Sequence, residues 1–232
     1  MAGAAEAPAP LEATGTVLAA EPLTPSIRRL VVALPPEVRL RYRAGMHVEL
    51  RTPGIARPRT YSIATAPDRE GLPPDGLLEF FVTRHEGGQA SGWLHGADRL
   101  GGALQLHGPY GTFGLPEGAL RPLLCLAGGS GILSVRDRAE VFALDALHAL
   151  ARRHANFSYL VTLTRETAVD PATGWRHGRI PEWLGQEFFD LSGFTVLAAG
   201  PPGFVEACVA TVLRLGASPE QVLTDSFTPT IP

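Results

Sequence analysis

The sequence predicts two domains, an antiparallel β-barrel followed by a doubly wound α/β domain with a parallel sheet. Three observations support this prediction. The first half carries short apolar strands separated by Pro and Gly clusters, and the second half alternates apolar strands with amphipathic helices. The chain of 232 residues is also long enough to bury two hydrophobic cores. We place the domains at residues 14–119 and 120–232, after a disordered start at residues 1–13.

The first half is expected to form a small antiparallel barrel. Its candidate strands are rich in β-branched or alternating apolar residues and are bounded by clusters such as Pro35-Pro36 and Pro73-Pro74. Helical periodicity is confined to residues 90–95. Strands at this spacing are typical of a barrel. The expected strands are residues 27–34, 47–51, 60–64, 77–83 and 103–106.

The second half begins with a continuous apolar run at residues 123–127 that ends in a glycine-rich turn. Such a run is typical of a buried parallel strand. Residues 139–153 then have apolar side chains at helical spacing, with basic residues at the C-terminal end, where the helix dipole favours positive charge. Later strands and one more helix complete the alternation of a doubly wound sheet. They are the strands at 157–163, 194–198 and 221–224 and the helix at 204–215.

Composition excludes several classes of protein. A net charge of −3 gives no basic field to hold nucleic acid or an anionic membrane. No apolar run is long enough to span a membrane, and the N-terminus does not resemble a signal peptide, so we expect a cytoplasmic protein. Cys125 and Cys208 are too few for a disulfide framework or an iron–sulfur cluster, and we expect both in the core. The histidines lack metal-ligand spacing, so no metal site is predicted.

The tetrapeptide Arg59-Thr60-Tyr61-Ser62 lies on a predicted strand. Because side chains alternate along a strand, Arg59 and Tyr61 share one face, and Thr60 and Ser62 share the other. An Arg fork suits a phosphate and a Tyr ring suits a flat heterocycle, which together fit a dinucleotide with a flavin at one end. The alternative interpretation is an amphipathic strand with a solvated Arg.

Two further segments of the first half are weak signals when taken singly. The segment from Gly87 to Ser91 follows a strand and begins a short helix, where backbone N–H groups and a Ser hydroxyl can receive a phosphate. The segment from Gly108 to Leu115 indicates a tight turn with aromatic core residues.

These three segments and the later glycine-rich turn follow the order found in the ferredoxin–NADP reductase superfamily, and residues 14–227 resemble that superfamily. The similarity is closest to the reductase components of bacterial aromatic-ring oxygenases, without their iron–sulfur domain. The resemblance implies a flavin-binding barrel followed by a nucleotide-binding domain. It implies FAD as cofactor, leaves FMN open, and implies NAD(P)H as co-substrate.

The resemblance also implies roles for individual residues of the barrel. Arg59 would pair with the flavin phosphate, beside Thr60 in the cofactor site, and Tyr61 would pack against the isoalloxazine ring. Ser62 would form a hydrogen bond with flavin N5, the atom that accepts hydride. The pyrophosphate would be held by Gly87, Gly88 and Ser91.

In the second half, the glycine-rich turn resembles the family's nicotinamide-nucleotide turn, whose glycines allow the backbone to approach a pyrophosphate closely. The segment 199–202, Ala-Gly-Pro-Pro, is similar to the family's Cys-Gly-Pro-Pro segment beside the nicotinamide, with Ala199 in place of Cys. The residues implied in nucleotide binding are Gly128, Gly129, Ser130, Gly131, Gly200, Pro201 and Pro202.

The C-terminal segment 224–227 resembles the family's closing acidic-x-aromatic motif. Phe227 would cover the flavin face that the nicotinamide approaches, and Asp225 would be a candidate for handling a proton. The alternative interpretation places Phe227 in the core at the end of the last strand.

One departure from the family concerns residues 132–136. They run directly from the glycine-rich turn to the next helix, so one βα unit of the usual size is missing. Either residues were omitted and the numbering was closed up, or the deletion is real; the Cα separations between residues 131 and 137 distinguish the two. A real deletion would impair nicotinamide binding.

We therefore expect an enzyme, a flavoprotein reductase that transfers hydride from NAD(P)H to FAD and passes electrons to a separate iron–sulfur protein, such as a ferredoxin or an oxygenase component. One alternative is a reductase of free flavin or another small acceptor. Another is a non-catalytic electron-transfer module with a defective nicotinamide site. The sequence does not choose between NADH and NADPH, and it leaves the oligomeric state open.

Overall fold

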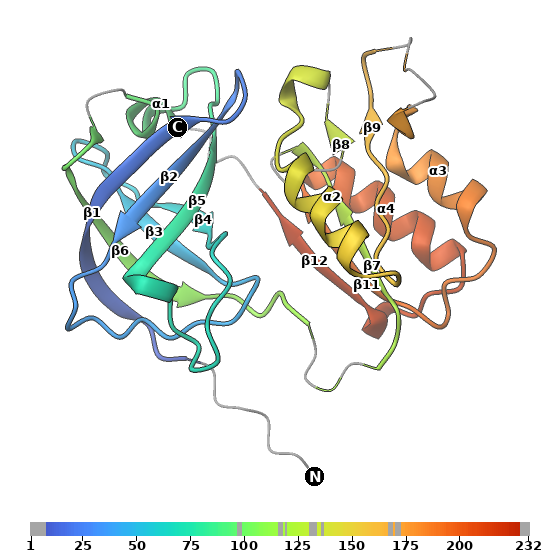
Figure 1. Ribbon diagram of the computed structural model, residues 1–232, viewed down its shortest axis with the longest axis horizontal. Helices are drawn as coiled ribbons and strands as arrows, with labels where there is room; N and C mark the ends of the chain where they lie inside the picture. Colours follow the sequence, from blue (N-terminus) through green and yellow to red (C-terminus); the bar gives the residue numbers. More distant parts are fainter. Residues whose placement is uncertain are drawn as a thin grey trace. The chain divides into compact units, whose positions relative to one another are not determined.

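The computed structural model describes residues 8–96, 99–115, 118, 120–129, 134–135, 137–166, 169 and 173–227. The chain divides between Leu115 and Pro116 into two compact units, a few residues before the predicted boundary at 119. Figure 1 shows an antiparallel sheet in the first unit and strands with flanking helices in the second. The two-domain fold predicted from the sequence is confirmed.

The first unit is a six-stranded, entirely antiparallel sheet with the order β4-β3-β6-β1-β2-β5. Side chains alternate between the core and the outside, so that Leu30, Leu50, Phe80 and Leu104 are fully buried. A helix, α1 (Gln89–Leu94), follows β5. The strands are β1 (Leu11–Pro22), β2 (Ile27–Ala33), β3 (His47–Arg51), β4 (Arg59–Ser62), β5 (Leu77–Thr83) and β6 (Ala103–Tyr110).

The long central strand β1 is absent from the sequence-based expectation, which treats residues 1–13 as disordered. Residues 11–13 are its first three residues, and Leu11 pairs with Gly108 of β6. Leu11 and Ala13 pack against the barrel core. The segment has weak strand propensity, so its conformation comes from ladders with β2 and β6 on both sides. Gly15 permits this packing, because a Cβ there would lie 2.4 Å from Cγ1 of Val32.

The second unit contains two separate parallel sheets, β12-β11-β7 and β10-β9-β8. Helices α3 (Ile180–Glu187) and α4 (Pro202–Arg214) pack together beside the first sheet, and α2 (Leu144–Arg153) packs beside the second. The strands are β7 (Leu123–Ala127), β8 (Ser134–Val135), β9 (Thr162–Leu163), β10 (Arg176–His177), β11 (Thr195–Gly200) and β12 (Val222–Ser226).

The connection between β7 and β8 is short in sequence. Only residues 128–133 lie between them, whereas a crossover between neighbouring parallel strands needs about a dozen residues or more. This spacing agrees with the predicted loss of a βα unit. The Cα separations that would test chain continuity involve residues 131–133 and 136, which lie outside the described residues.

Two predicted elements are shorter in the structure. The helix expected at 139–153 is a 3₁₀ turn at Arg138–Glu140 followed by α2, because Ala143 has a left-handed φ of 57° that interrupts the helix. The strand expected at 157–163 is reduced to β9, since its partner β8 has only two residues. In the parts of the chain that the structure describes, no helix is long and apolar enough to cross a membrane.

Candidate functional site

Strand β4 presents the Arg59–Ser62 tetrapeptide at the edge of the barrel sheet. Its register with β3 places Tyr61 opposite Val48 and Arg59 opposite Leu50, and both β3 residues are fully buried. Arg59 and Tyr61 are half-buried, whereas Thr60 and Ser62 are exposed. The predicted division of the tetrapeptide between two faces is confirmed.

Tyr61 provides a neutral aromatic surface at this edge. Its side chain packs against the barrel core, and burial raises its pKa to about 12, while the charge of Arg59 acts in the opposite direction. The phenol therefore stays protonated at neutral pH. An uncharged ring of this kind suits packing against a flat heterocycle.

Arg59 is held by main-chain carbonyl groups. One of its guanidinium nitrogens, Nη1, donates to the carbonyl oxygens of Arg57 at 2.9 Å and Pro58 at 3.2 Å. No ion pair between Arg59 and a carboxylate is found among the described residues. A guanidinium at the sheet edge without a carboxylate partner among the described residues suits a phosphate group.

On the outer face of the sheet, ladder register brings titratable side chains beside Ser62. His47 of β3 lies opposite both Ser62 of β4 and Tyr110 of β6. The Tyr110 hydroxyl is 2.7 Å from Nδ1 of His107, and that nitrogen is 3.8 Å from a carboxylate oxygen of Glu49. Sequence reasoning included Tyr110 in the Gly108–Leu115 segment but gave none of these side chains a role beside Ser62, because they come from different strands of the chain.

The loop before α1 contains the second predicted cluster. Gly87 has a φ of 71°, and a Cβ on Gly88 would lie 2.5 Å from Oγ of Ser91. Ser91 is buried, and its hydroxyl accepts from the backbone N–H of His85 at 3.2 Å and donates to the carbonyl of Gly88 at 3.3 Å. The structure thus places this hydroxyl inside the loop, where it fixes the backbone.

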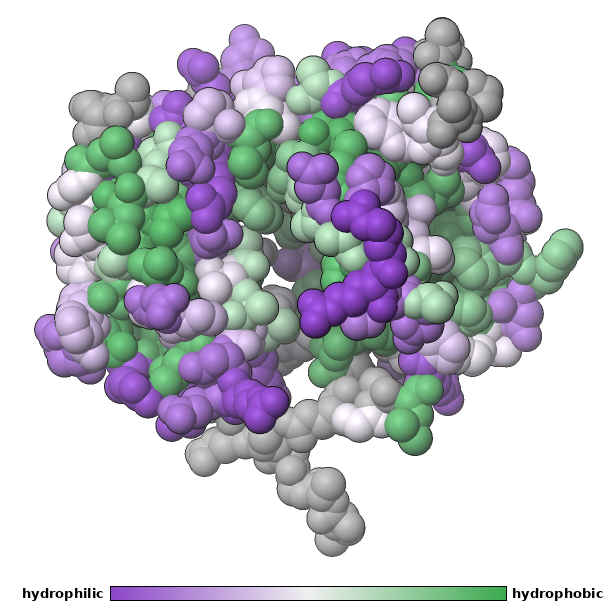
Figure 2. Space-filling view, in the orientation of Figure 1, coloured by the Kyte–Doolittle hydropathy of each residue, from purple (hydrophilic) through white to green (hydrophobic). Residues whose placement is uncertain are grey.

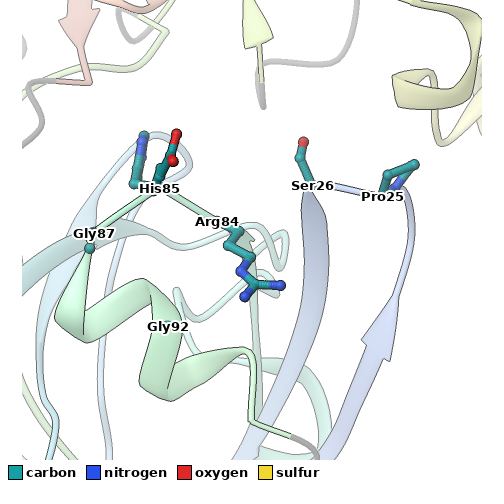
Figure 3. Close-up of a pocket in the computed structure, with 8 residues that line it drawn as sticks. Pro25, Ser26, Arg84, His85, Gly87 and Gly92 are labelled. Carbon is teal, nitrogen blue, oxygen red and sulfur yellow. The ribbon is translucent and has the colours of Figure 1, made fainter.

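A pocket of ≈ 440 Å³ opens beside this loop. Figure 3 shows Arg84 extending into the space between α1 and Ser26. Sequence reasoning did not single out Arg84 or His85. A basic residue within a glycine-rich loop could have drawn attention to them. The lining residues are Pro25, Ser26, Arg84, His85, Glu86, Gly87, Gly88 and Gly92.

Two guanidinium groups, those of Arg28 and Arg84, lie close to His95 beside this pocket, whose lining also includes the carboxylate of Glu86. Burial lowers the pKa of His95, and Arg28 and Arg84 lower it further, against the effect of the hydrogen bond between Nε2 of His95 and the Val82 carbonyl at 2.8 Å. Two guanidinium groups close enough to disfavour a further positive charge also favour an anion. The loop glycines and this charge fit the pyrophosphate of a dinucleotide.

In the second unit, close packing of glycines joins the ends of β7 and β11 to α4. The backbone N–H of Gly128 donates to the carbonyl of Ala199 at 2.9 Å. A Cβ on Gly128 or on Gly200 would lie within 2.9 Å of the Phe204 ring. The N-terminus of α4, with Pro201 as cap and Pro202 as its first residue, therefore begins at the carboxyl ends of these strands.

The structure describes only some of the other site residues predicted in the second half. Gly129 has a φ of 64°, and Ser130 and Gly131 lie outside the described residues. Asp225 pairs with Ala199 across the β11–β12 ladder. Phe227 is half-buried, and its backbone N–H donates to the carbonyl of Gly200 at 2.8 Å, so it ends beside the glycine cluster.

The two cysteines differ in their environment. Cys208 is fully buried on α4 as predicted, and burial raises its pKa to about 12. The prediction that Cys125 is a core residue is wrong, because it is exposed on β7. Alternation along β7 turns Leu124 and Leu126 toward the core and Cys125 away from it. Among the described residues, no group of His, Cys, Asp and Glu could hold a metal ion.

Comparison with known proteins agrees with this arrangement. The family model described as oxidoreductase FAD-binding domain matches residues 14–114. A ferredoxin–NAD(P)+ reductase component of naphthalene 1,2-dioxygenase/salicylate 5-hydroxylase systems from Ralstonia sp. is 30% identical, over 93% of this chain and 69% of the relative. The phenol 2-monooxygenase reductase component DmpP from Pseudomonas sp. strain CF600 is also 30% identical, over 86% of this chain and 61% of the relative.

Among solved structures, the cytochrome P450 reductase GcoB of Amycolatopsis superposes with a TM-score of 0.87 at 28% identity, covering 99% of this chain and 74% of that protein. The chain thus spans 61 to 69% of the length of the two curated relatives. From the motifs, the fold and these matches together, the chain belongs to the ferredoxin–NAD(P)+ reductase-like family of FAD-binding oxidoreductases.

Proposed function

We propose that this chain is a flavoprotein reductase that takes hydride from NAD(P)H onto FAD and delivers electrons to a separate iron–sulfur protein. The observation that carries the proposal is the presence in one chain of the Arg59–Tyr61 edge in the first unit and the glycine–α4 junction in the second. The relatives are reductase components of oxygenase systems. FAD supplies the redox chemistry, since it accepts hydride and releases electrons singly.

The residues of the barrel would bind and orient the cofactor. Arg59 pairs with a phosphate, Tyr61 packs against the isoalloxazine ring, and the Ser62 hydroxyl forms a hydrogen bond with N5. Backbone N–H groups at Gly87 and Gly88 bind the pyrophosphate in the loop that Ser91 closes. Thr60, on the same face as Ser62, lines the outer side of the site.

The residues of the second unit would bind the nicotinamide nucleotide. The glycine-rich turn that begins at Gly128 binds its pyrophosphate, and Gly200, Pro201 and Pro202 lie beside its nicotinamide. Phe227 covers the flavin face until the nicotinamide enters, and Asp225 holds a proton near the site. An iron–sulfur acceptor on another chain fits the cysteine content, because a cluster needs more thiolates than Cys125 and Cys208 supply.

A second function, a flavin-binding electron-transfer module without NAD(P)H oxidation, is favoured by the short connection between β7 and β8. This short connection leaves little of the segment that normally begins a helix after the glycine-rich turn.

Anaerobic titration with NADH and NADPH distinguishes the reductase from the electron-transfer module. Purified protein with bound FAD is expected to lose its visible flavin absorbance on addition of NADH or NADPH.

A protein that binds FAD, keeps that absorbance with both nucleotides, yet is reduced by dithionite would instead be the electron-transfer module. Reoxidation by an acidic plant-type [2Fe–2S] ferredoxin, compared with free FMN and menadione, then distinguishes an iron–sulfur acceptor from small acceptors. Failure of the protein to bind either FAD or FMN would contradict both functions.

A further inference from the structure

Positive charge is concentrated in one part of the first unit. Residues 38–69, which contain β3, β4 and the loops beside them, carry seven arginines and only two acidic residues. Because the whole chain has a net charge of −3, the remainder of the chain is strongly acidic. All of these arginines are exposed except Arg59, which is half-buried. They are Arg39, Arg41, Arg43, Arg51, Arg57, Arg59 and Arg69.

Three of these arginines lie on one side of the segment before β3. Arg39, Arg41 and Arg43 are exposed, whereas Leu40 and Tyr42 between them are buried in the barrel core. Alternation along an extended segment therefore directs all three guanidinium groups outward. The segment follows the lower edge of the first unit, in blue at the left of Figure 1, where Figure 2 shows many hydrophilic residues.

This segment lies next to the chain that leaves β4. The backbone N–H of Ile63 donates to the carbonyl of Met46 at 3.0 Å, and the Tyr42 hydroxyl donates to the carbonyl of Thr65 at 3.1 Å. Arg69 follows on the same stretch of chain. One group of arginines thus lies beyond the end of β4.

A second group lies at the other end of β4. Arg51 is the last residue of β3, and Arg57 comes two residues before β4 begins. The strand has four residues, which extend over about 13 Å at ~3.3 Å per residue. Tyr61 and Ser62, the proposed flavin contacts, therefore lie between the two groups of arginines.

Neighbouring carboxylates balance only part of this charge. Glu70 pairs with Arg39 at 3.1 Å, and the Asp68 carboxylate accepts from two backbone N–H groups of its own loop. Arg41 donates to a main-chain carbonyl group, and among the described residues no ion pair is found for Arg41 or Arg43. The acidic residues in and beside the region are Glu37, Glu49, Asp68 and Glu70.

We propose that these exposed arginines form the docking surface for an acidic iron–sulfur protein, the electron acceptor in the proposed function on which this inference rests. An iron–sulfur cluster held by four thiolates is negatively charged in both of its oxidation states. Arg59 is left out because the FAD phosphate would neutralise it. The arginine surface consists of Arg39, Arg41, Arg43, Arg51, Arg57 and Arg69.

The charge distribution of the chain explains how such a partner would find this surface. The acidic remainder of the chain repels an acidic protein, whereas the arginine surface attracts it. Complementary charge of this kind orients a partner and raises its association rate. An acidic acceptor would thus arrive beside Tyr61 and Ser62, where the flavin gives up its electrons.

Binding of an acidic plant-type [2Fe–2S] ferredoxin to the full chain with its flavin tests the proposal. Calorimetry is expected to show at least about tenfold weaker binding at ~500 mM than at ~50 mM NaCl, because salt screens the arginines. Arg41→Glu/Arg43→Glu should weaken binding about tenfold or more at the lower salt concentration. Arg41→Gln/Arg43→Gln, which removes the charge without reversing it, should show a smaller loss.

Arg152→Glu/Arg153→Glu is the matched control. These two arginines of α2 are also exposed, and the control has the same net charge as Arg41→Glu/Arg43→Glu. We expect the control to keep the affinity of the wild type within about twofold. Equal losses in both variants, or binding that does not change with salt, would overturn the proposal. Binding of the wild type to phosphatidylserine vesicles but not to ferredoxin would assign the arginines to a membrane and also overturn it.

Electron transfer separates this inference from the proposed function. The bound flavin is reduced anaerobically with stoichiometric dithionite; each reduced flavin then gives two electrons and releases a proton, and each of two ferredoxin molecules takes one electron. Arg41→Glu/Arg43→Glu should slow transfer to ferredoxin about tenfold and leave transfer to menadione, a small neutral acceptor, unchanged. Equal slowing with both acceptors would contradict the docking surface. A chain that neither NADH nor NADPH reduces, but that shows this selective defect, would contradict the reductase and support the docking surface.

Discussion

Single residues in the barrel have roles that depend on their neighbours. Ser91 lies in the predicted phosphate loop, yet its hydroxyl is used between His85 and Gly88. Tyr61 stays uncharged at neutral pH because burial raises its pKa to about 12. Arg59 is oriented by hydrogen bonds to the backbone carbonyls of Arg57 and Pro58, the two residues before β4. The chemistry of each residue type was predictable from the sequence, but its partners were not.

Replacing Arg59 tests the phosphate contact. We expect Arg59→Lys to weaken FAD binding about tenfold, because a Lys ammonium cannot form the paired hydrogen bonds of a guanidinium; the loss corresponds to ~1.4 kcal/mol. Quenching of FAD fluorescence measures the Kd. Arg57→Lys serves as control, since Arg57 offers only its carbonyl to this arrangement. Equal losses in both variants would show a general charge effect.

Tyr42 makes a prediction about alkaline pH. Its side chain is buried, its hydroxyl donates to the Thr65 carbonyl at 3.1 Å, and burial together with Asp68 raises its pKa from 10.0 to about 12. Above pH 10 the unfolded chain releases the phenolic proton and the folded chain keeps it. The first unit should therefore lose stability between pH 10 and pH 12.

Tyr42→Phe should reduce this alkaline loss while costing ~1 kcal/mol at neutral pH through the missing hydrogen bond. Urea unfolding of the first unit at several pH values measures both effects. A variant with the same alkaline slope as the wild type would assign the loss to other groups, of which Tyr61 is the first candidate because burial raises its pKa in the same way.

At the scale of elements, close approaches of backbone decide how strands and helices meet. Phe204 brings α4 onto Gly128 and Gly200 with no space for a Cβ. Gly111, at the end of β6, has a φ of 98° and lies against the His47 ring, so a Cβ there would be 2.9 Å from Nδ1. Such glycines set the spacing between an element and the site residues that it carries.

Substitution of Gly128 tests the α4 junction. Gly128→Ala would place a Cβ 2.8 Å from the Phe204 ring, so we expect a loss of ~1–3 kcal/mol in the stability of the second unit. Gly185→Ala in α3 has open space around it and should be neutral or stabilising by up to ~1 kcal/mol. Thermal unfolding followed by circular dichroism compares the two. A tolerated Gly128→Ala would mean that α4 moves at little cost.

At the scale of the whole molecule, the two units have separate cores, so we expect each unit to be stabilised by its own ligand. We expect calorimetry to resolve two transitions, and FAD in hundredfold excess over its Kd should raise the stability of the first unit by ~2.7 kcal/mol. NADH or NADPH should shift only the second transition, and only if the nucleotide site is functional. A single cooperative transition would show that the units unfold together.

The sequence by itself determined the two-domain order, most strands and the site motifs, because alternation, glycine-rich turns and the Arg-Thr-Tyr-Ser tetrapeptide are local patterns. Tertiary structure decided the rest. Ladder register placed His47 opposite both Ser62 and Tyr110, and pairing on both sides ordered β1 despite weak propensity. The exposure of Cys125 also follows from packing, since the core lies on the face of β7 that carries Leu124 and Leu126. Contacts between distant segments carry no mark in either segment alone, so only the folded chain reveals them.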